Sequence, residues 1–158
     1  SCSSPTRGLF AGGYQDPAAA RINAIDYITI ATTGNAQDFG DLIEARDKVA
    51  GVSSKTRGVF AGGFSPGTPS ATDIIQYVTI ASTGDAIDFG NLIVETFGKG
   101  GGASNSERGL YPGGATPSVT NAIDYITIAS TGDAKDFGDL VMARRHPGGV
   151  SDSHGGLS

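Results

Sequence analysis

Three triplets of oxygen-bearing side chains recur along the chain, at a spacing that suits either a bound cation or a series of turns. They are Asn35, Asp38 and Asp41; Asp85, Asp88 and Asn91; and Asp133, Asp136 and Asp139. Carboxylate and amide oxygens are the ligands that Ca²⁺ selects, but the spacing differs from that of an EF-hand loop. Turn residues and a solvated strand face explain the triplets without a metal. We therefore predict no metal and no other cofactor, and calcium is the alternative.

The tripeptide Asp-Phe-Gly at 38–40 has the letters of the magnesium-binding motif of protein kinases. The chain lacks the glycine-rich loop, the strand lysine and the catalytic-loop motif that accompany it in those enzymes. The tripeptide recurs at 88–90 and 136–138, so we predict an outer strand with an apolar anchor. The segment Phe-Ala-Gly-Gly at 10–13 likewise lacks the spacing of a phosphate-binding loop.

The remaining reactive side chains show no catalytic arrangement. His146 and His154 are the only histidines, and no acid or nucleophile is arranged around them in the sequence. Cys2 is the only cysteine, and Val52 and Val150 fill its position in related segments, which indicates a small core residue. We therefore predict that the protein is not an enzyme, and we assign no catalytic residue.

One arginine recurs at the same position of three related segments, as Arg7, Arg57 and Arg108. An aspartate recurs downstream of it, as Asp26 and Asp124. Opposite charges at a fixed spacing predict a repeated ion pair within or between the structural units. A ligand site at the loop end of the scaffold is the alternative interpretation of these arginines.

Three segments differ between the copies and are candidates for recognition, because loops on a repeat scaffold usually carry the binding residues. They are 15–23, 65–73 and 115–121, and Tyr14 and Phe64 immediately precede the first two. The predicted ligand or partner residues are Arg7, Arg57, Arg108, Tyr14 and Phe64.

All of these residues belong to a repeat with a period of about 50 residues. The segment 7–13 returns at 57–63 and, with changes, at 108–114, and the segment 24–31 matches 122–129 letter for letter. A fixed period of this length is typical of stacked or radially arranged units. We predict a single repeat domain over 1–158, with repeats of about 4–54, 54–105 and 105–150. Residues 150–158 would be the start of a truncated fourth repeat.

Each repeat is predicted to contain four short strands. The first strand is the small-residue run before the recurring arginine, which is 50–54 in the second repeat. The other three, numbered in the first repeat, are the run 8–12 after the arginine and the runs 25–30 and 38–42. The run 25–30 is rich in β-branched and aromatic residues, which favour strands, and the glycine of 33–35 suits a tight hairpin. Both faces of 25–30 are largely apolar, which predicts sheets that are buried on both sides.

The composition is typical of an ordered fold with many turns. Glycine contributes 25 of the 158 residues, and 38% of residues are hydrophobic. The net charge is −5 and the basic residues form no stripe, so we predict no nucleic-acid binding. No apolar run approaches the roughly 18 residues of a membrane span, so we predict no membrane insertion.

The repeat resembles the kelch repeat, whose family builds β-propellers from one four-stranded blade per repeat. That family is marked by a Gly-Gly doublet, two spaced aromatic residues and a closing arginine. The matching doublets are Gly12-Gly13, Gly62-Gly63 and Gly113-Gly114; the aromatics are Tyr27, Tyr77, Tyr125, Phe39, Phe89 and Phe137; the arginines are Arg46 and Arg144. Thr96 replaces the arginine in the second repeat, and phenylalanine stands where the family usually has tryptophan. The resemblance implies an all-β, kelch-like propeller segment of three four-stranded blades.

The amino-acid sequence of the repeat also resembles the kelch-like arrays of phage virion proteins, notably from phages of cyanobacteria. The resembling segments are 57–63, 123–133 and 136–140. This resemblance implies a virion or extracellular location and a non-enzymatic structural or adhesion role in assembly or host-surface binding. Other virion proteins or surface glycans would be partners. A secreted, lectin-like carbohydrate-binding propeller is the alternative.

Three blades are too few to close a propeller, because such rings usually have about four to eight. The two end blades would each leave an apolar face and strand edges exposed, and such surfaces usually mark an interface. We therefore expect the chain to bind itself, either as a closed six-bladed dimer or as an open polymer; the alternative is that it is a segment of a longer array of blades.

Overall fold

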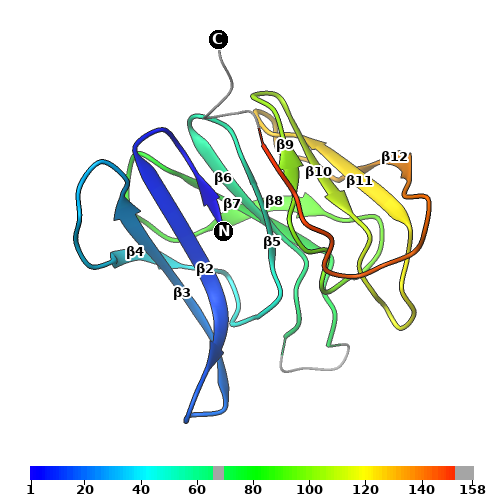
Figure 1. Ribbon diagram of the computed structural model, residues 1–158, viewed down its shortest axis with the longest axis horizontal. Coiled ribbons are helices and arrows are strands. Elements are labelled where there is room, and N and C mark those ends of the chain that lie inside the picture. The colour runs from blue at the N-terminus through cyan, green and yellow to red at the C-terminus, as the bar shows by residue number, and fades with distance from the viewer. Residues whose placement is uncertain (66–69, 152–158) are drawn as a thin grey trace.

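The chain folds into three antiparallel β-sheets that follow one another along the sequence. In the computed structural model, which describes residues 1–65 and 70–151, each sheet has four strands (Figure 1). These described residues form no helix, so the prediction of an all-β chain with three four-stranded repeats is confirmed. It follows that this part of the chain holds no helix long and apolar enough to cross a membrane.

The strands of each sheet pair in chain order, from an inner strand before the arginine to an outer strand that contains the phenylalanine. Sheet 1 contains β1 (Cys2–Ser3), β2 (Arg7–Gln15), β3 (Ala20–Thr29) and β4 (Gln37–Asp41). Sheet 2 contains β5 (Ala50–Ser53), β6 (Arg57–Ala61), β7 (Ile74–Thr79) and β8 (Ile87–Asn91). Sheet 3 contains β9 (Ala103–Ser104), β10 (Arg108–Pro112), β11 (Ala122–Thr127) and β12 (Lys135–Asp139).

The same strand register recurs in the three sheets, because equivalent residues occupy equivalent steps. The recurring arginine always faces a threonine of the third strand, in the pairs Arg7–Thr29, Arg57–Thr79 and Arg108–Thr127. A bulge interrupts the pairing of the third and fourth strands at one position, after Ile25, Ile75 and Ile123. A bulge increases local twist, so sheets with the same bulge twist alike and can stack closely.

The glycine doublets tie the second strand of each sheet to the segment that leaves its outer strand. The first glycine has a φ of 62–64°, a region that favours glycine, at Gly12, Gly62 and Gly113. The backbone N–H of the second glycine donates to a carbonyl oxygen at 2.9–3.0 Å, in the pairs Gly13–Arg46, Gly63–Thr96 and Gly114–Arg144. Because the backbone makes this contact, it forms with Thr96 as it does with arginine at the closing position.

Two apolar clusters fill the spaces between consecutive sheets. Leu9, Ile25, Phe39 and Leu42 of sheet 1 pack against Phe60, Val78, Ile80 and Ala86 of sheet 2. Val59, Ile75, Phe89 and Leu92 of sheet 2 pack in the same way against Tyr111, Ile126, Ile128 and Ala134 of sheet 3. Within residues 1–65 and 70–151, only sheet 2 is therefore covered on both faces, and Figure 1 shows it between the other two sheets.

A row of serines links the inner edges of the sheets. Ser3 N–H donates to Ser53 Oγ at 3.3 Å, and Ser104 Oγ donates to the Ser53 carbonyl at 3.0 Å. Ser151 continues this row, because its Oγ donates to the Ser104 carbonyl at 2.9 Å and the two residues form a parallel β-bridge. The segment 148–151 thus lies where the inner strand of a further sheet would be; residues 152–158 of the predicted fourth repeat lie outside the described residues.

Candidate functional site

In the part of the chain that the structure describes, the outermost sheets each present one uncovered face, and these two faces are the main candidate for interaction. We call the uncovered face of sheet 1, with Phe10, Ile28, Ile30 and Ala36, the N-terminal face. We call the uncovered face of sheet 3, with Leu110, Ile123, Phe137 and Leu140, the C-terminal face. Each residue aligns in the repeat with a residue that is buried between two sheets.

The exposure of equivalent side chains shows what the end sheets lack. Phe10 is 50% exposed, whereas Phe60 and Tyr111 at the same position are 0% exposed. Ile30 is 53% exposed, whereas Ile80 and Ile128 are 1% and 0% exposed. On the other side, Phe137 is 48% exposed, whereas Phe39 and Phe89 are each 2% exposed. Both end faces therefore carry the residues of a sheet–sheet joint without the neighbouring sheet.

The recurring arginines connect neighbouring sheets through a backbone carbonyl. Arg7 Nη1 donates to the Ile80 carbonyl at 2.8 Å, and Arg57 Nη1 donates to the Ile128 carbonyl at 3.0 Å. Each guanidinium also lies over a tyrosine of its own sheet, at 4.7 Å for Arg7 over Tyr27. Arg108 lies over Tyr125 at the same distance and is exposed on the C-terminal face.

The predicted ion pair between these arginines and the recurring aspartates is wrong. In the strand register Phe10 faces Asp26, and Leu9 faces Tyr27. Arg7 is three residues from Phe10, so alternation places its side chain on the opposite face of the sheet from Asp26. Asp124 instead forms an ion pair with Lys99, at 2.8 Å.

The acidic triplets contribute to the joints through their first members. The loop after β7 approaches the outer strand of sheet 1, where Gly84 N–H donates to the Phe39 carbonyl at 2.7 Å. Asp85 Oδ1 accepts a hydrogen bond from Asp41 N–H at 3.0 Å, and Asp133 Oδ1 accepts one from Asn91 N–H at 3.0 Å. These two side chains therefore cap the outer strand of the preceding sheet. Among residues 1–65 and 70–151, no group of three or more acidic, histidine or cysteine side chains is placed to hold a metal.

Buried charges lie beside both joints, and sequence reasoning did not identify them as buried. Lys99 Nζ donates to the carbonyls of Tyr111 and Gly113, each at 3.1 Å, in addition to its ion pair with Asp124. Arg46 Nη1 donates to the Gly62 carbonyl at 3.2 Å, and burial lowers its pKa, which the charge of Glu44 partly offsets. Lys99 and Arg46 thus reach equivalent carbonyls, although Lys99 comes from a glycine-rich segment that suggests an exposed loop.

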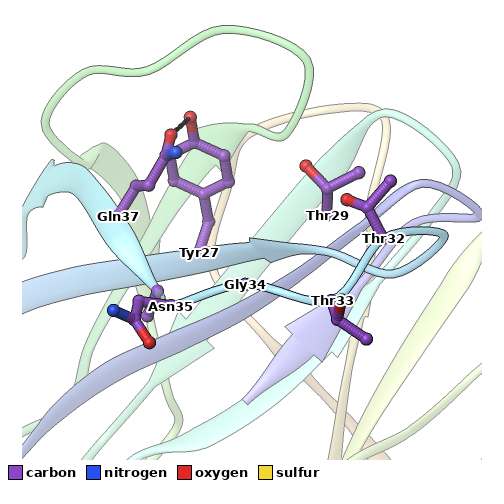
Figure 2. Close-up of a pocket in the computed structure, with 8 residues that line it drawn as sticks. Tyr27, Thr29, Thr32, Thr33, Gly34, Asn35 and Gln37 are labelled. Atoms are coloured by element: carbon purple, nitrogen blue, oxygen red, sulfur yellow. Dashed lines mark hydrogen bonds between the residues drawn. The ribbon is translucent and has the colours of Figure 1, made fainter.

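The hairpin between β3 and β4 forms a small polar pocket of about 250 Å³. Figure 2 shows Tyr27 and Gln37 on one side of it, where the tyrosine hydroxyl donates to Gln37 Oε1 at 2.6 Å, and shows Thr29 and Thr32 on the other. An equivalent pocket of about 250 Å³ lies beside Tyr125 in sheet 3, with Lys135 in the position of Gln37. Both are smaller than the roughly 300–1,000 Å³ of sites for drug-sized ligands, so they suit a small polar molecule.

The structure brings the predicted partner residues Tyr14 and Phe64 together through an arginine that the sequence did not indicate. The Arg21 guanidinium lies 4.3 Å from the centre of the Phe64 ring and 5.8 Å from that of Tyr14. Arg21 Nε also donates to Asp47 Oδ1 at 2.8 Å. Phe64 further contacts Phe97 edge to face, with ring centres 5.5 Å apart. These residues are far apart in sequence, so only the stacking of the sheets could show the cluster.

The predicted repeat marks lie within and between the sheets. The aromatic pairs meet edge to face with ring centres 5.9–6.1 Å apart, as Tyr27–Phe39, Tyr77–Phe89 and Tyr125–Phe137. Cys2 packs against the cluster between sheets 1 and 2, and burial raises the pKa of its thiol to about 12. At that pKa almost no thiolate forms at neutral pH, so the thiol has the character of a small core side chain.

No protein-family model matches the chain, and no curated protein matches it.

Proposed function

We propose that the protein is a non-enzymatic structural module that assembles with copies of itself through its two end faces. The observation that carries this proposal is the exposure of Phe10 and Phe137, whose equivalents are buried in every internal joint. Clusters of exposed apolar side chains of this kind usually mark interaction surfaces. The three sheets are propeller-like blades in this proposal, and assembly places a blade of another copy against each end face.

The resemblance of the repeat to kelch-like arrays supports a more specific setting. We propose a component of a phage virion or fibre, located in the particle or outside the cell, that contributes to assembly or to adhesion at a host surface. Blade arrays suit this role because they offer many equivalent loops on a rigid scaffold.

The test of self-assembly is the absolute mass of the chain in solution, measured by light scattering across a hundredfold range of concentration. We expect either a stable species of two chains, which fits a six-bladed ring, or larger material that grows with concentration. Rings and open filaments are the two outcomes of a repeated head-to-tail contact. A monodisperse single chain over the whole range would contradict the proposal.

Carbohydrate binding is the second candidate, and the recurring hairpin pocket favours it. The pocket beside Tyr27 combines an aromatic ring with threonine and amide groups, which can accept and donate hydrogen bonds to sugar hydroxyls. If this is the function, a glycan array gives a signal that free sugar competes away and that Gln37→Ala weakens at least tenfold. Ile87→Ala, at the equivalent position of sheet 2, is the matched control.

A further inference from the structure

We infer that the C-terminal face of one copy receives the N-terminal face of a second copy in the register of the two internal joints. The inference rests on the proposed function, since it specifies how the proposed self-assembly occurs. The partner is therefore a second copy of this chain, and the contact is head to tail. Four sets of observations support the same register.

The apolar residues on the two end faces are complementary. In the joint between sheets 1 and 2, Phe60 packs with Leu9 and Phe39 of the preceding sheet. The equivalents of Leu9 and Phe39 on the C-terminal face are Leu110 and Phe137, which line a hollow of about 390 Å³. The equivalent of Phe60 on the N-terminal face is the exposed Phe10, so Phe10 of the second copy enters this hollow.

The charged residues of the two faces are complementary in the same register. Arg108 takes the position from which Arg7 reaches the Ile80 carbonyl, and the equivalent carbonyl on the N-terminal face is that of Ile30. The joint therefore places the Arg108 guanidinium on the Ile30 carbonyl of the second copy. This bond would supply the sheet-to-sheet contact that Arg7 and Arg57 already make.

A second cation of sheet 3 has an equivalent role. Arg144 aligns with the buried Arg46, which reaches the Gly62 carbonyl, but Arg144 itself is exposed. The joint places Arg144 at the Gly12 carbonyl of the second copy. Asp26, exposed on the N-terminal face, aligns with the Asp124 that pairs with Lys99, so opposite charges meet at this point as well.

The loop residues of the N-terminal face keep the hydrogen-bonding groups of the internal joints. Asp85 and Asp133 each accept a backbone hydrogen bond from the outer strand of the preceding sheet. The equivalent residue in sheet 1 is Asn35, whose side-chain oxygen accepts in the same way. In the joint, the Asn35 side-chain oxygen accepts a hydrogen bond from the Asp139 N–H of the first copy. The backbone of the same loop donates to the Phe137 carbonyl, as Gly84 N–H donates to that of Phe39.

A glycine on the N-terminal face has no internal reason for its small size. A Cβ atom at Gly58 would lie 2.5 Å from Cys2 Sγ, and one at Gly109 would lie 2.6 Å from Val52 Cγ2, both in the preceding sheet. At the equivalent Gly8 a Cβ atom would meet only Ile28 of its own sheet, at 3.4 Å. Gly8 does not have a positive φ, so the close approach of a preceding sheet is the remaining explanation for this glycine.

The inner edge of the joint requires one strand to leave. The segment 148–151 already lies beside Ser104, where β1 of the second copy would be placed. A Cβ atom at Gly149 would collide with the carbonyl oxygen of Gly102, and Ser1 at the equivalent position has such an atom. Segment 148–151 therefore keeps its place beside Ser104, and β1 of the second copy is displaced from the inner edge of its own sheet.

The test uses two charge variants, each of which disables one face. Phe10→Glu disables the N-terminal face and Phe137→Glu disables the C-terminal face; both side chains are about half exposed in the single chain, so both variants should fold. Ile87→Glu, 60% exposed on sheet 2 and away from both faces, is the control. Each variant and each mixture is examined by light scattering and by native mass spectrometry.

A head-to-tail joint predicts that each single variant is a monomer, because every joint needs one face of each kind. The equimolar mixture of the two variants should give a 1:1 heterodimer and nothing larger, because only one intact pair of faces remains. The Ile87→Glu variant should assemble as the original chain does.

Other outcomes separate this inference from the proposed function. If Phe137→Glu or Phe10→Glu alone forms a dimer, like faces bind each other; the inference is overturned and self-assembly stands. If the mixture remains monomeric although the original chain assembles, the joint uses other surfaces and the inference is again overturned. If the original chain never assembles, the proposed function fails together with the inference.

Discussion

Replacing Phe60 with alanine should lower the free energy of unfolding by about 3–5 kcal/mol, the range for phenylalanine-to-alanine changes in a core. Phe60 is fully buried in the cluster between sheets 1 and 2, where it contacts the aromatic and aliphatic side chains of sheet 1. The change removes a ring from a space that the sheet backbones cannot close. Urea denaturation followed by tyrosine fluorescence measures the loss.

The matched control is Phe10→Ala, at the equivalent position of sheet 1. Both changes are made in the Phe137→Glu background, in which no head-to-tail joint can form. Phe10 is half exposed there, so its loss should cost about 1 kcal/mol, in proportion to the area it buries. Equal losses at the two positions would show that sheet 2 does not lie between the other two sheets as described.

Replacing Lys99 with methionine should lower the free energy of unfolding by about 3–5 kcal/mol, because it leaves a buried carboxylate without its cation. Lys99 and Asp124 have side chains only 2% and 5% exposed, and the ammonium also serves two backbone carbonyls. Methionine has a similar length but donates no hydrogen bond. The measurement is the urea midpoint and slope of unfolding at neutral pH.

The double variant Lys99→Met with Asp124→Leu separates the cost of an unpaired charge from the value of the pair. Removing both charges of a buried pair is often neutral, so we expect most of the lost stability to return. Lys135→Met, at an exposed lysine of the same sheet, should change stability by less than about 0.5 kcal/mol. A double variant as unstable as Lys99→Met alone would place the cost in the two unsatisfied carbonyls.

The strands of each repeat could be predicted because the same local preferences recur in all three copies. The β-branched run that became β3 and β7, and the glycine turn after it, each determine structure within a few residues. The apolar residues on both faces of that run also predicted sheets covered on both sides, which holds for sheet 2. These features depend on neighbours in the sequence, so sequence patterns were sufficient.

The contacts between sheets could not be predicted in the same way. The interpretation of Arg7 and Asp26 as an ion pair considered their charges but not the strand register, which places them on opposite faces. The burial of Lys99 depends on two carbonyls of the next sheet, 12 and 14 residues along the chain. The cluster of Arg21, Phe64 and Phe97 likewise depends on how far each sheet is rotated against its neighbour.

The segment 148–151 has a consequence for the rate at which copies join. If β1 must leave the inner edge of one copy before that copy is accepted by another, its departure is a unimolecular step. The rate of joining then rises with protein concentration only until this step becomes rate-limiting. Above that concentration the rate is constant. The same departure exposes Cys2, whose thiol is protected by burial in the single chain. Chemical modification of this thiol would therefore report each joint that forms.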